Sequence, residues 1–142
     1  YASGKFSTSP YAAKTAVAGS LVAVLRGTME DRGLELIKPM SRCIRRGEIH
    51  EIILTDDGEA RPGSRVDRIA YLGFAEIAGG GVMVSGDEVF LEGEKIGTLA
   101  GFDETHMPNH LNIVVRADRL ADGVERGVRP GVAVRFAAAE DK

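Results

Sequence analysis

Residues 101–115 read Gly-Phe-Asp-Glu-Thr-His-Met-Pro-Asn-His-Leu-Asn-Ile-Val-Val. A mostly apolar segment precedes this stretch, and the β-branched segment Leu111 to Arg116 continues from it, so a polar loop between two strands is predicted. Pro108 argues against a regular helix in the loop, because it lacks an amide donor and favours an extended Met107. Rigid frameworks often hold functional groups on loops, and the rest of the chain is expected to supply that framework.

The remaining sequence is typical of short strands separated by turns. The chain has 18 glycines among 142 residues, which favours a mainly β barrel or sandwich. Gly73 is expected to bend or bulge a long apolar segment, and one short helix is predicted from Asp118 as N-cap to Gly127 as C-terminal stop. Strands are expected over 17–25, 34–38, 48–55, 66–77, 82–84, 88–91, 95–102, 111–116 and 132–137.

Length and composition predict one domain over residues 15–137, with a flexible or docking arm at 1–14 and a frayed tail at 138–142. No apolar run approaches the roughly 18 residues of a membrane span, so no membrane partner is expected. The formal charge of −3 provides no electrostatic basis for binding nucleic acid. The single cysteine, Cys43, is consistent with a cytoplasmic location. The apolar segments and the arm suit a homo-oligomer.

Residues 107–113, Met-Pro-Asn-His-Leu-Asn-Ile, resemble the Pro-x-x-Leu-Asn-[Ile/Val] motif of archaeal CTP-dependent riboflavin kinases. The predicted short helix leads into residues 127–136, Gly-Val-Arg-Pro-Gly-Val-Ala-Val-Arg-Phe, and this ending resembles the helix-then-strand closure of the barrel in the same group. Those enzymes are cradle-loop β-barrels, so the resemblance implies a small closed barrel of the cradle-loop (RIFT-like) kind. It covers about the last quarter of the chain.

The sequence also departs from that family. Asn109-His110 stands where the family has Gly-Thr, whose threonine helps to hold magnesium, and the family's glycine-rich nucleotide segment has no counterpart here. Kinase activity is therefore not implied. Asn112 is the matching polar position, and its side chain either faces a ligand or satisfies backbone at the start of a strand.

The three histidines, His50, His106 and His110, form the first candidate centre. Three imidazoles around one ion would make an open site for zinc, manganese, iron or nickel, with a free position to polarise a carbonyl or bind water. His106 and His110 have helical i, i+4 spacing, but a loop containing proline does not guarantee that their rings converge. Strict alternation along Glu48 to Thr55 places His50 and Glu51 on opposite faces of a strand.

Acid–base chemistry without a metal is the alternative. Histidine side chains titrate near neutral pH, and Asp103 or Glu104 could fix the tautomer of His106 or His110. The loop could also be structural, with its polar side chains capping turns.

Ligand binding is predicted for the polar groups around this centre. Arg42, in a short basic segment before the His50 strand, would match a carboxylate or phosphate. The other predicted ligand-binding residues are Glu51, Thr105, Asn109 and Asn112.

Two functions follow from the sequence. The first is a small enzyme that acts on a small polar, anionic metabolite by histidine and carboxylate acid–base chemistry or with a divalent metal; isomerase, lyase and hydrolase reactions all fit. The second is a non-catalytic barrel that binds a ligand or assembles into an oligomer.

Overall fold

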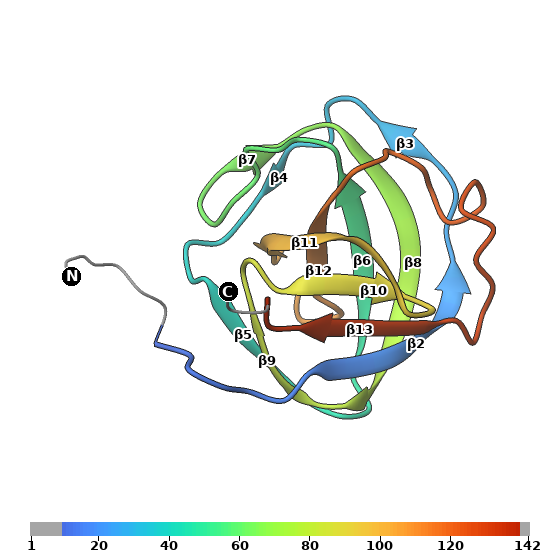
Figure 1. The fold of residues 1–142 in the computed structure, drawn as a ribbon. Helices are drawn as coiled ribbons and strands as arrows, with labels where there is room; N and C mark the ends of the chain where they lie inside the picture. Colours follow the sequence, from blue (N-terminus) through green and yellow to red (C-terminus); the bar gives the residue numbers. More distant parts are fainter. Residues whose placement is uncertain (1–9, 140–142) are drawn as a thin grey trace.

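In the computed structural model, which describes residues 10–139, all regular secondary structure is β-strand (Figure 1). The mainly β prediction is therefore confirmed. The strands are β2 (Val17–Val24), β3 (Thr28–Met29), β4 (Leu34–Glu35), β5 (Ser41–Ile44), β6 (Ile49–Thr55), β7 (Arg65–Val66), β8 (Ile69–Gly79), β9 (Gly81–Val84), β10 (Glu88–Leu91), β11 (Glu94–Asp103), β12 (Asn112–Ala117) and β13 (Ala133–Ala137).

Seven of these strands close into a barrel. Their order is β2-β13-β10-β11-β12-β6-β8, and β2 pairs with β8 to complete the ring. Most neighbours are antiparallel, whereas β12 and β6 run parallel, with Asn112 beside Glu51 and Arg116 beside Thr55. The chain reaches this parallel pair through the long β8 to β11 excursion around the barrel, because parallel neighbours cannot be joined by a tight turn.

Shorter pairs lie around the barrel. β3 adds to the end of β8, β4 pairs with β7, and β5 pairs with β9. Figure 1 shows the β4–β7 pair beside one end of β6 and the β5–β9 pair beside β2. The β4–β7 pair covers part of the outer face of the barrel, and the backbone amide of Glu35 on β4 bonds to Asp103 of the site described below.

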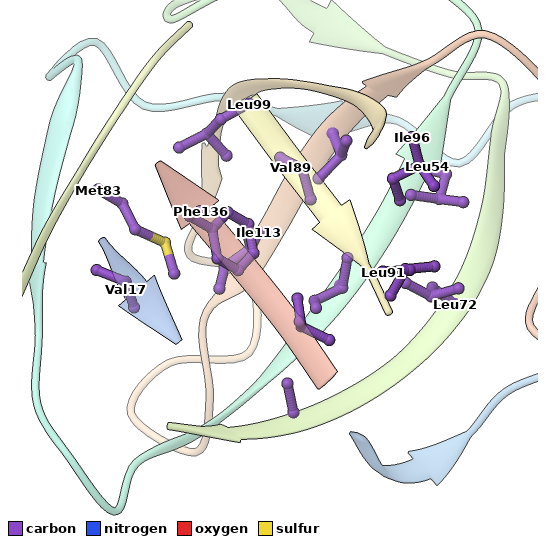
Figure 2. Close-up of a cluster of buried hydrophobic side chains, with 14 of the residues drawn as sticks. Val17, Leu54, Leu72, Met83, Val89, Leu91, Ile96, Leu99, Ile113 and Phe136 are labelled. Carbon is purple, nitrogen blue, oxygen red and sulfur yellow. The ribbon is translucent and has the colours of Figure 1, made fainter. Parts of the chain in front are cut away.

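Apolar side chains fill the inside of the barrel, as Figure 2 shows for Leu54, Leu72 and Ile113 among others. The largest fully buried members of this core are Leu21, Ile52, Leu54, Leu72, Met83, Leu99, Phe102, Leu111 and Phe136. A second cluster contains Ile53, Val114 and Ala100, which alternate with interior residues and therefore lie on the outer face, packed against Leu34, Leu36 and Val66. Both faces of β6 and β12 are buried as a result.

The long apolar segment bends where the sequence predicted it. Ile52 pairs with Gly73 but Ile53 pairs with Tyr71, so Leu72 is an extra residue at a bulge. A side chain at Gly73 would meet the carbonyl oxygen of Ala23 on β2. The glycine thus permits both the bulge and the close approach of two strands.

The predicted hairpin around residues 92–94 is also present. β10 and β11 are joined by Glu92 and Gly93, both at positive φ (50° and 82°), as a two-residue primed turn requires. The structure differs elsewhere. The predicted strand at 34–38 is reduced to Leu34–Glu35, and β3 and β5 are strands that were not predicted.

The short helix predicted over Asp118 to Arg126 is wrong. The cap is Asp122, four residues later than expected: its Oδ1 accepts the amide of Glu125 (2.8 Å), and the Glu125 carboxylate accepts the amide of Asp122 (3.3 Å). Gly127, at φ 70°, ends the segment as predicted. Only one turn fits between this cap and this stop, with the amide of Arg126 bonded to the carbonyl of Asp122.

Most of the predicted N-terminal arm, residues 1–9, and the last three residues of the tail lie outside the described residues. Within the described part, Lys14 forms a 2.8 Å ion pair with Asp87, and both side chains are almost completely buried. Residue 14 therefore docks onto the barrel. Among residues 10–139, no helix has the length and apolar character needed to cross a membrane.

Replacing Gly73 by alanine should destabilise the barrel, because the added methyl group would collide with the Ala23 carbonyl. The expected loss is about 1–3 kcal/mol of unfolding free energy, measured by urea denaturation. Gly58→Ala is the matched control, since nothing lies within 4 Å of a Cβ at that position; it should change stability by less than about 0.5 kcal/mol. Equal stabilities of the two variants would contradict this account of Gly73.

Candidate functional site

Four side chains lie in one row across the outer face of the barrel. Asp103 of β11 pairs with Asn112 of β12. Asn112 in turn pairs with Glu51 of β6, and Glu51 pairs with Phe74 of β8. Directly paired residues point to the same face of a sheet, so the row is continuous over four neighbouring strands. The loop at 104–111 follows Asp103 and returns at Asn112, so it begins and ends on this row.

Asp103 anchors that loop. Its buried carboxylate accepts hydrogen bonds from the backbone amides of Thr105 (2.9 Å) and Glu35 (3.0 Å) and from Nδ2 of Asn112 (3.0 Å). Burial acts to raise the pKa of Asp103, but these hydrogen bonds to the charged form outweigh it, and the net pKa is lowered. Asp103 is therefore an ionised group that joins the loop, β4 and β12.

His110 lies over Glu51 and Phe74. Its Nε2 atom is 3.3 Å from Oε1 of Glu51, and the two side chains are 11% and 8% exposed. The contact is not aligned as a hydrogen bond, and Nε2 has no hydrogen-bond partner among the described residues. The ring also meets Phe74 edge-on, with centroids 4.9 Å apart. An imidazole is thus held against a carboxylate and packed on an aromatic ring.

Burial is the main influence on the pKa of Glu51. Desolvation raises the pKa of its carboxyl, and the attraction of His110, His106 and Arg32 only partly opposes that rise. No described residue other than His110 approaches the carboxylate within ion-pair distance. A carboxyl group with a raised pKa beside an imidazole is suited to exchange a proton with it.

His106 and Arg32 extend the cluster towards solvent. The His106 and His110 rings are 5.0 Å apart at a tilt of 31°. Nη2 of Arg32 lies 3.3 Å from Nε2 of His106, and Nε of Arg32 donates to the Tyr71 hydroxyl at 3.2 Å. Arginine can only donate, so Nε2 of His106 is the acceptor. Glu51, His110, His106 and Arg32, called the histidine cluster below, thus lead from a buried acid to an exposed ring and a guanidinium group.

His50 does not join this cluster. Alternation along β6 places His50 on the inner side with Ile52, whereas Glu51 points outward. Nδ1 of His50 accepts the amide of Leu111 (3.0 Å), which puts the proton of a neutral ring on Nε2, 3.1 Å from Oε1 of Glu48. The hydrogen bond from His50 is the main cause that lowers the pKa of Glu48. Both ring nitrogens are occupied, and His50 supports the end of the loop.

The other predicted ligand-binding groups have different places. Arg42 pairs with Glu104 at 2.6 Å, so the guanidinium and the loop carboxylate satisfy each other. Thr105 and Asn109 are exposed and make backbone bonds within the loop. Asn112 is fully buried, and its Oδ1 has no hydrogen-bond partner among the described residues. Of the five, Glu51 lies in the histidine cluster and Asn112 lies beside it in the row.

A metal site formed by His50, His106 and His110 stays a prediction. The structure brings His106 and His110 together but directs His50 to other partners. No set of three His, Cys, Asp or Glu side chains in residues 10–139 is arranged to hold an ion.

Three members of the site were not predicted: Arg32, Tyr71 and Phe74. Arg32 lies in a turn that showed no signal beyond its charge. Phe74 could have been placed by following the predicted bulge, because an extra residue at Leu72 shifts the alternation and turns Phe74 outward while Ala75 and Ile77 stay inside.

Residues 11–137 match the model of a family of unknown function, DUF6917, and the chain belongs to that family. Comparison with curated proteins and with solved structures gave no match.

Removing the Asp103 carboxylate should loosen the loop and lower stability. Asp103→Ala leaves three donors without their acceptor, and we expect a loss of roughly 3 kcal/mol at pH 7. Because the pKa of Asp103 is lowered in the folded state, its contribution is present above the pKa of the unfolded chain and is lost as pH falls through the folded pKa. The difference from wild type in urea denaturation should therefore shrink below about pH 4. Asp31→Ala, at an exposed aspartate, is the control and should cost little at any pH.

Replacing Glu51 by glutamine should raise the stability of the protein at neutral pH, whereas removing Asp103 lowers it. A raised folded-state pKa means that the stability contributed by the protonated form is complete below the unfolded pKa and is lost as pH rises through the folded pKa. Glu51→Gln removes this loss, and we expect the melting temperature at pH 7 to rise by roughly 3 °C, with no difference near pH 4. A lower melting temperature at pH 7 would show that the attraction of His110 outweighs burial.

Proposed function

We propose that this protein is an enzyme that transfers a proton to or from a small polar, anionic metabolite. In this proposal His110 is the acid–base group that meets the substrate, and Glu51 orients it and exchanges a proton with its Nε2 atom. A carboxylate on one ring nitrogen and a substrate on the other is a recurrent arrangement for histidine catalysis. Isomerase, lyase and hydrolase reactions all include such a step.

The Glu51–His110 contact carries this proposal. The two groups are 3.3 Å apart and mostly buried, and Nε2 of His110 has no hydrogen-bond partner in the described chain. Retaining such an atom beside a carboxyl group of raised pKa is typical of functional sites.

Arg32 supports an anionic substrate. Its guanidinium group lies on the solvent side of the cluster beside the exposed His106 ring, and no carboxylate in residues 10–139 lies within ion-pair distance of it. A carboxylate or phosphate bound there would lie next to the two imidazoles. Arg42 is less suitable, because Glu104 already pairs with it.

We prefer the acid–base form to the metal-assisted form because the contacts of His50 leave it no free nitrogen. Assignment of the barrel to the cradle-loop group also stays a proposal. It is supported by the residues shared with archaeal CTP-dependent riboflavin kinases and by the closed seven-stranded barrel. A cytoplasmic location remains a prediction from the cysteine content.

A non-catalytic assembly module is the second candidate. Two apolar side chains on strands that flank β8, Val22 of β2 and Ile49 of β6, are 42% and 45% exposed, and Phe74 lies between these strands on the outer face. Apolar groups on three adjacent strands could meet a second copy of the chain.

The enzyme proposal can be tested without knowing the reaction. Purified protein would be incubated in D₂O with a panel of small carboxylic acids, hydroxy acids, keto acids and sugar phosphates, and ¹H NMR would follow both consumption and deuterium exchange. We expect at least one compound to react, and Glu51→Gln and His110→Ala to slow it by roughly 100-fold or more. Arg32→Gln should raise KM more than it lowers kcat.

Glu88→Gln is the matched control, because it makes the same carboxylate-to-amide change at a β10 residue that pairs with Lys95 outside the cluster. A reaction that proceeds at the wild-type rate in both Glu51→Gln and His110→Ala would refute the proposed roles. No reaction with any compound, together with a stable oligomer that Ile49→Asp dissociates, would favour the assembly module.

A further inference from the structure

A polar hollow lies away from the histidine cluster, at the start of β11. It has a volume of about 240 Å³ and is formed by the β10–β11 turn and the segment that leads into β13. Its apolar wall consists of Leu91, Ile96, Val128 and Val132, which belong to or pack against the interior core. Arg119 and Arg126 also line it. None of these residues takes part in the histidine cluster.

Arg126 is a fixed cation without an ionic partner. Its Nε donates to the carbonyl of Ala121 (3.1 Å), and its Nη2 donates to the carbonyl of Arg119 (2.7 Å). The side chain is half-buried, and no carboxylate in the described residues lies within ion-pair distance of it. Burial, followed by the repulsion of Arg119, lowers the pKa of Arg126, although a guanidinium group stays charged at neutral pH.

Arg119 adds a second positive charge at the edge of the hollow. It is exposed, and its side chain makes no hydrogen bond or ion pair with residues 10–139. Two like charges at one hollow, one of them held in place by backbone carbonyls, would be relieved by a bound anion. The carbonyl bonds orient the Arg126 guanidinium before any ligand arrives, which lowers the entropic cost of binding.

The acids around the hollow limit what that anion can be. Glu92 and Glu94 both line it. Glu92 accepts the amide of Ala133 at 2.9 Å, and Glu94 and Asp118 act on Arg126 from beyond ion-pair distance. These negative charges would disfavour a dianion such as a phosphate ester. A single carboxylate matches the planar guanidinium fork, and the apolar wall provides a surface for the rest of the molecule.

We propose that Arg119 and Arg126 bind the carboxylate of a small monocarboxylic acid whose apolar part packs against Leu91, Ile96, Val128 and Val132. This site is separate from the histidine cluster. The hollow lies at the start of β11 and the cluster lies beside its end, and this strand of ten residues corresponds to roughly 30 Å of extended chain. The proposal therefore stands whether or not the chain is an enzyme.

Hexanoate is a suitable probe, with acetate as a carboxylate lacking an apolar chain, hexanamide as its uncharged analogue and inorganic phosphate as a dianion. Titration of ¹⁵N-labelled full-length protein would follow the backbone amides of Ile96, Gly127 and Val128 and the Nε–H of Arg126. We expect saturable shifts at these groups with hexanoate, and binding weaker by roughly tenfold or more for each of the other three compounds.

Arg126→Gln should weaken hexanoate binding by at least about tenfold and Arg119→Gln by a smaller factor. If Arg126→Gln disturbs the backbone, Arg119→Gln still tests the proposal, because the Arg119 side chain makes no hydrogen bond or ion pair with residues 10–139 that the substitution could break. Arg129→Gln, at an exposed arginine two residues past Gly127, should bind as wild type does. Hexanoate that shifts no amide near the hollow, unchanged affinity in Arg119→Gln and Arg126→Gln, or phosphate that binds as tightly as hexanoate would overturn the proposal.

Discussion

The parallel pairing of β6 with β12 is the constraint on which the site depends. All other neighbouring strands of this barrel run antiparallel. The parallel pair brings the starts of β6 and β12, some sixty residues apart in the sequence, to the same end of the barrel. Asn112 and Glu51 become direct neighbours through this register, and the antiparallel partners β11 and β8 add Asp103 and Phe74 on either side. An antiparallel pairing would have placed Glu51 and Asn112 at opposite ends of the barrel.

The loop at 104–111 is then fixed from both faces of the sheet. On the outer face Asp103 receives three hydrogen bonds, and on the inner side His50 accepts the amide of Leu111. Asp103 and His50, whose polar atoms have hydrogen-bond partners, lie on either side of Glu51 and His110, whose polar atoms have few partners among the described residues. Stability is concentrated in the supports of the site, while the central pair retains a buried carboxyl group of raised pKa and a ring nitrogen whose only polar neighbour among the described residues is that carboxyl group.

Local patterns were enough to predict much of the fold. Alternation identified β6 and the opposite orientation of His50 and Glu51, and Gly73 marked the bulge in β8. The helix was wrong because the prediction took Asp118 as N-cap and overlooked the spacing Asp122-x-x-Glu125, whose two residues cap each other in the structure. The pairing order of the strands is a long-range property, and no local pattern determines it.

The candidate site was likewise predictable only where it depends on local sequence. The density of polar residues in the loop indicated where to look, and His106, His110 and Glu51 do come together there. Arg32 could not have been predicted, because its position beside His106 depends on how the β3–β4 turn folds over β8. Asp103, expected to fix the tautomer of a histidine, accepts hydrogen bonds from two backbone amides and the Asn112 side chain, and only the folded chain places these donors around it.

Successive residues of β6 serve two different environments. His50, Ile52 and Leu54 belong to the inner side of the barrel, whereas Glu51 and Ile53 belong to the outer surface that carries the loop and the β4–β7 cover. Inserting or deleting one residue in this strand would exchange the two sets, placing a carboxylate among interior side chains and leucine under the histidines. Sequence drift in this strand is therefore restricted to substitutions, while length variation is left to the surrounding turns.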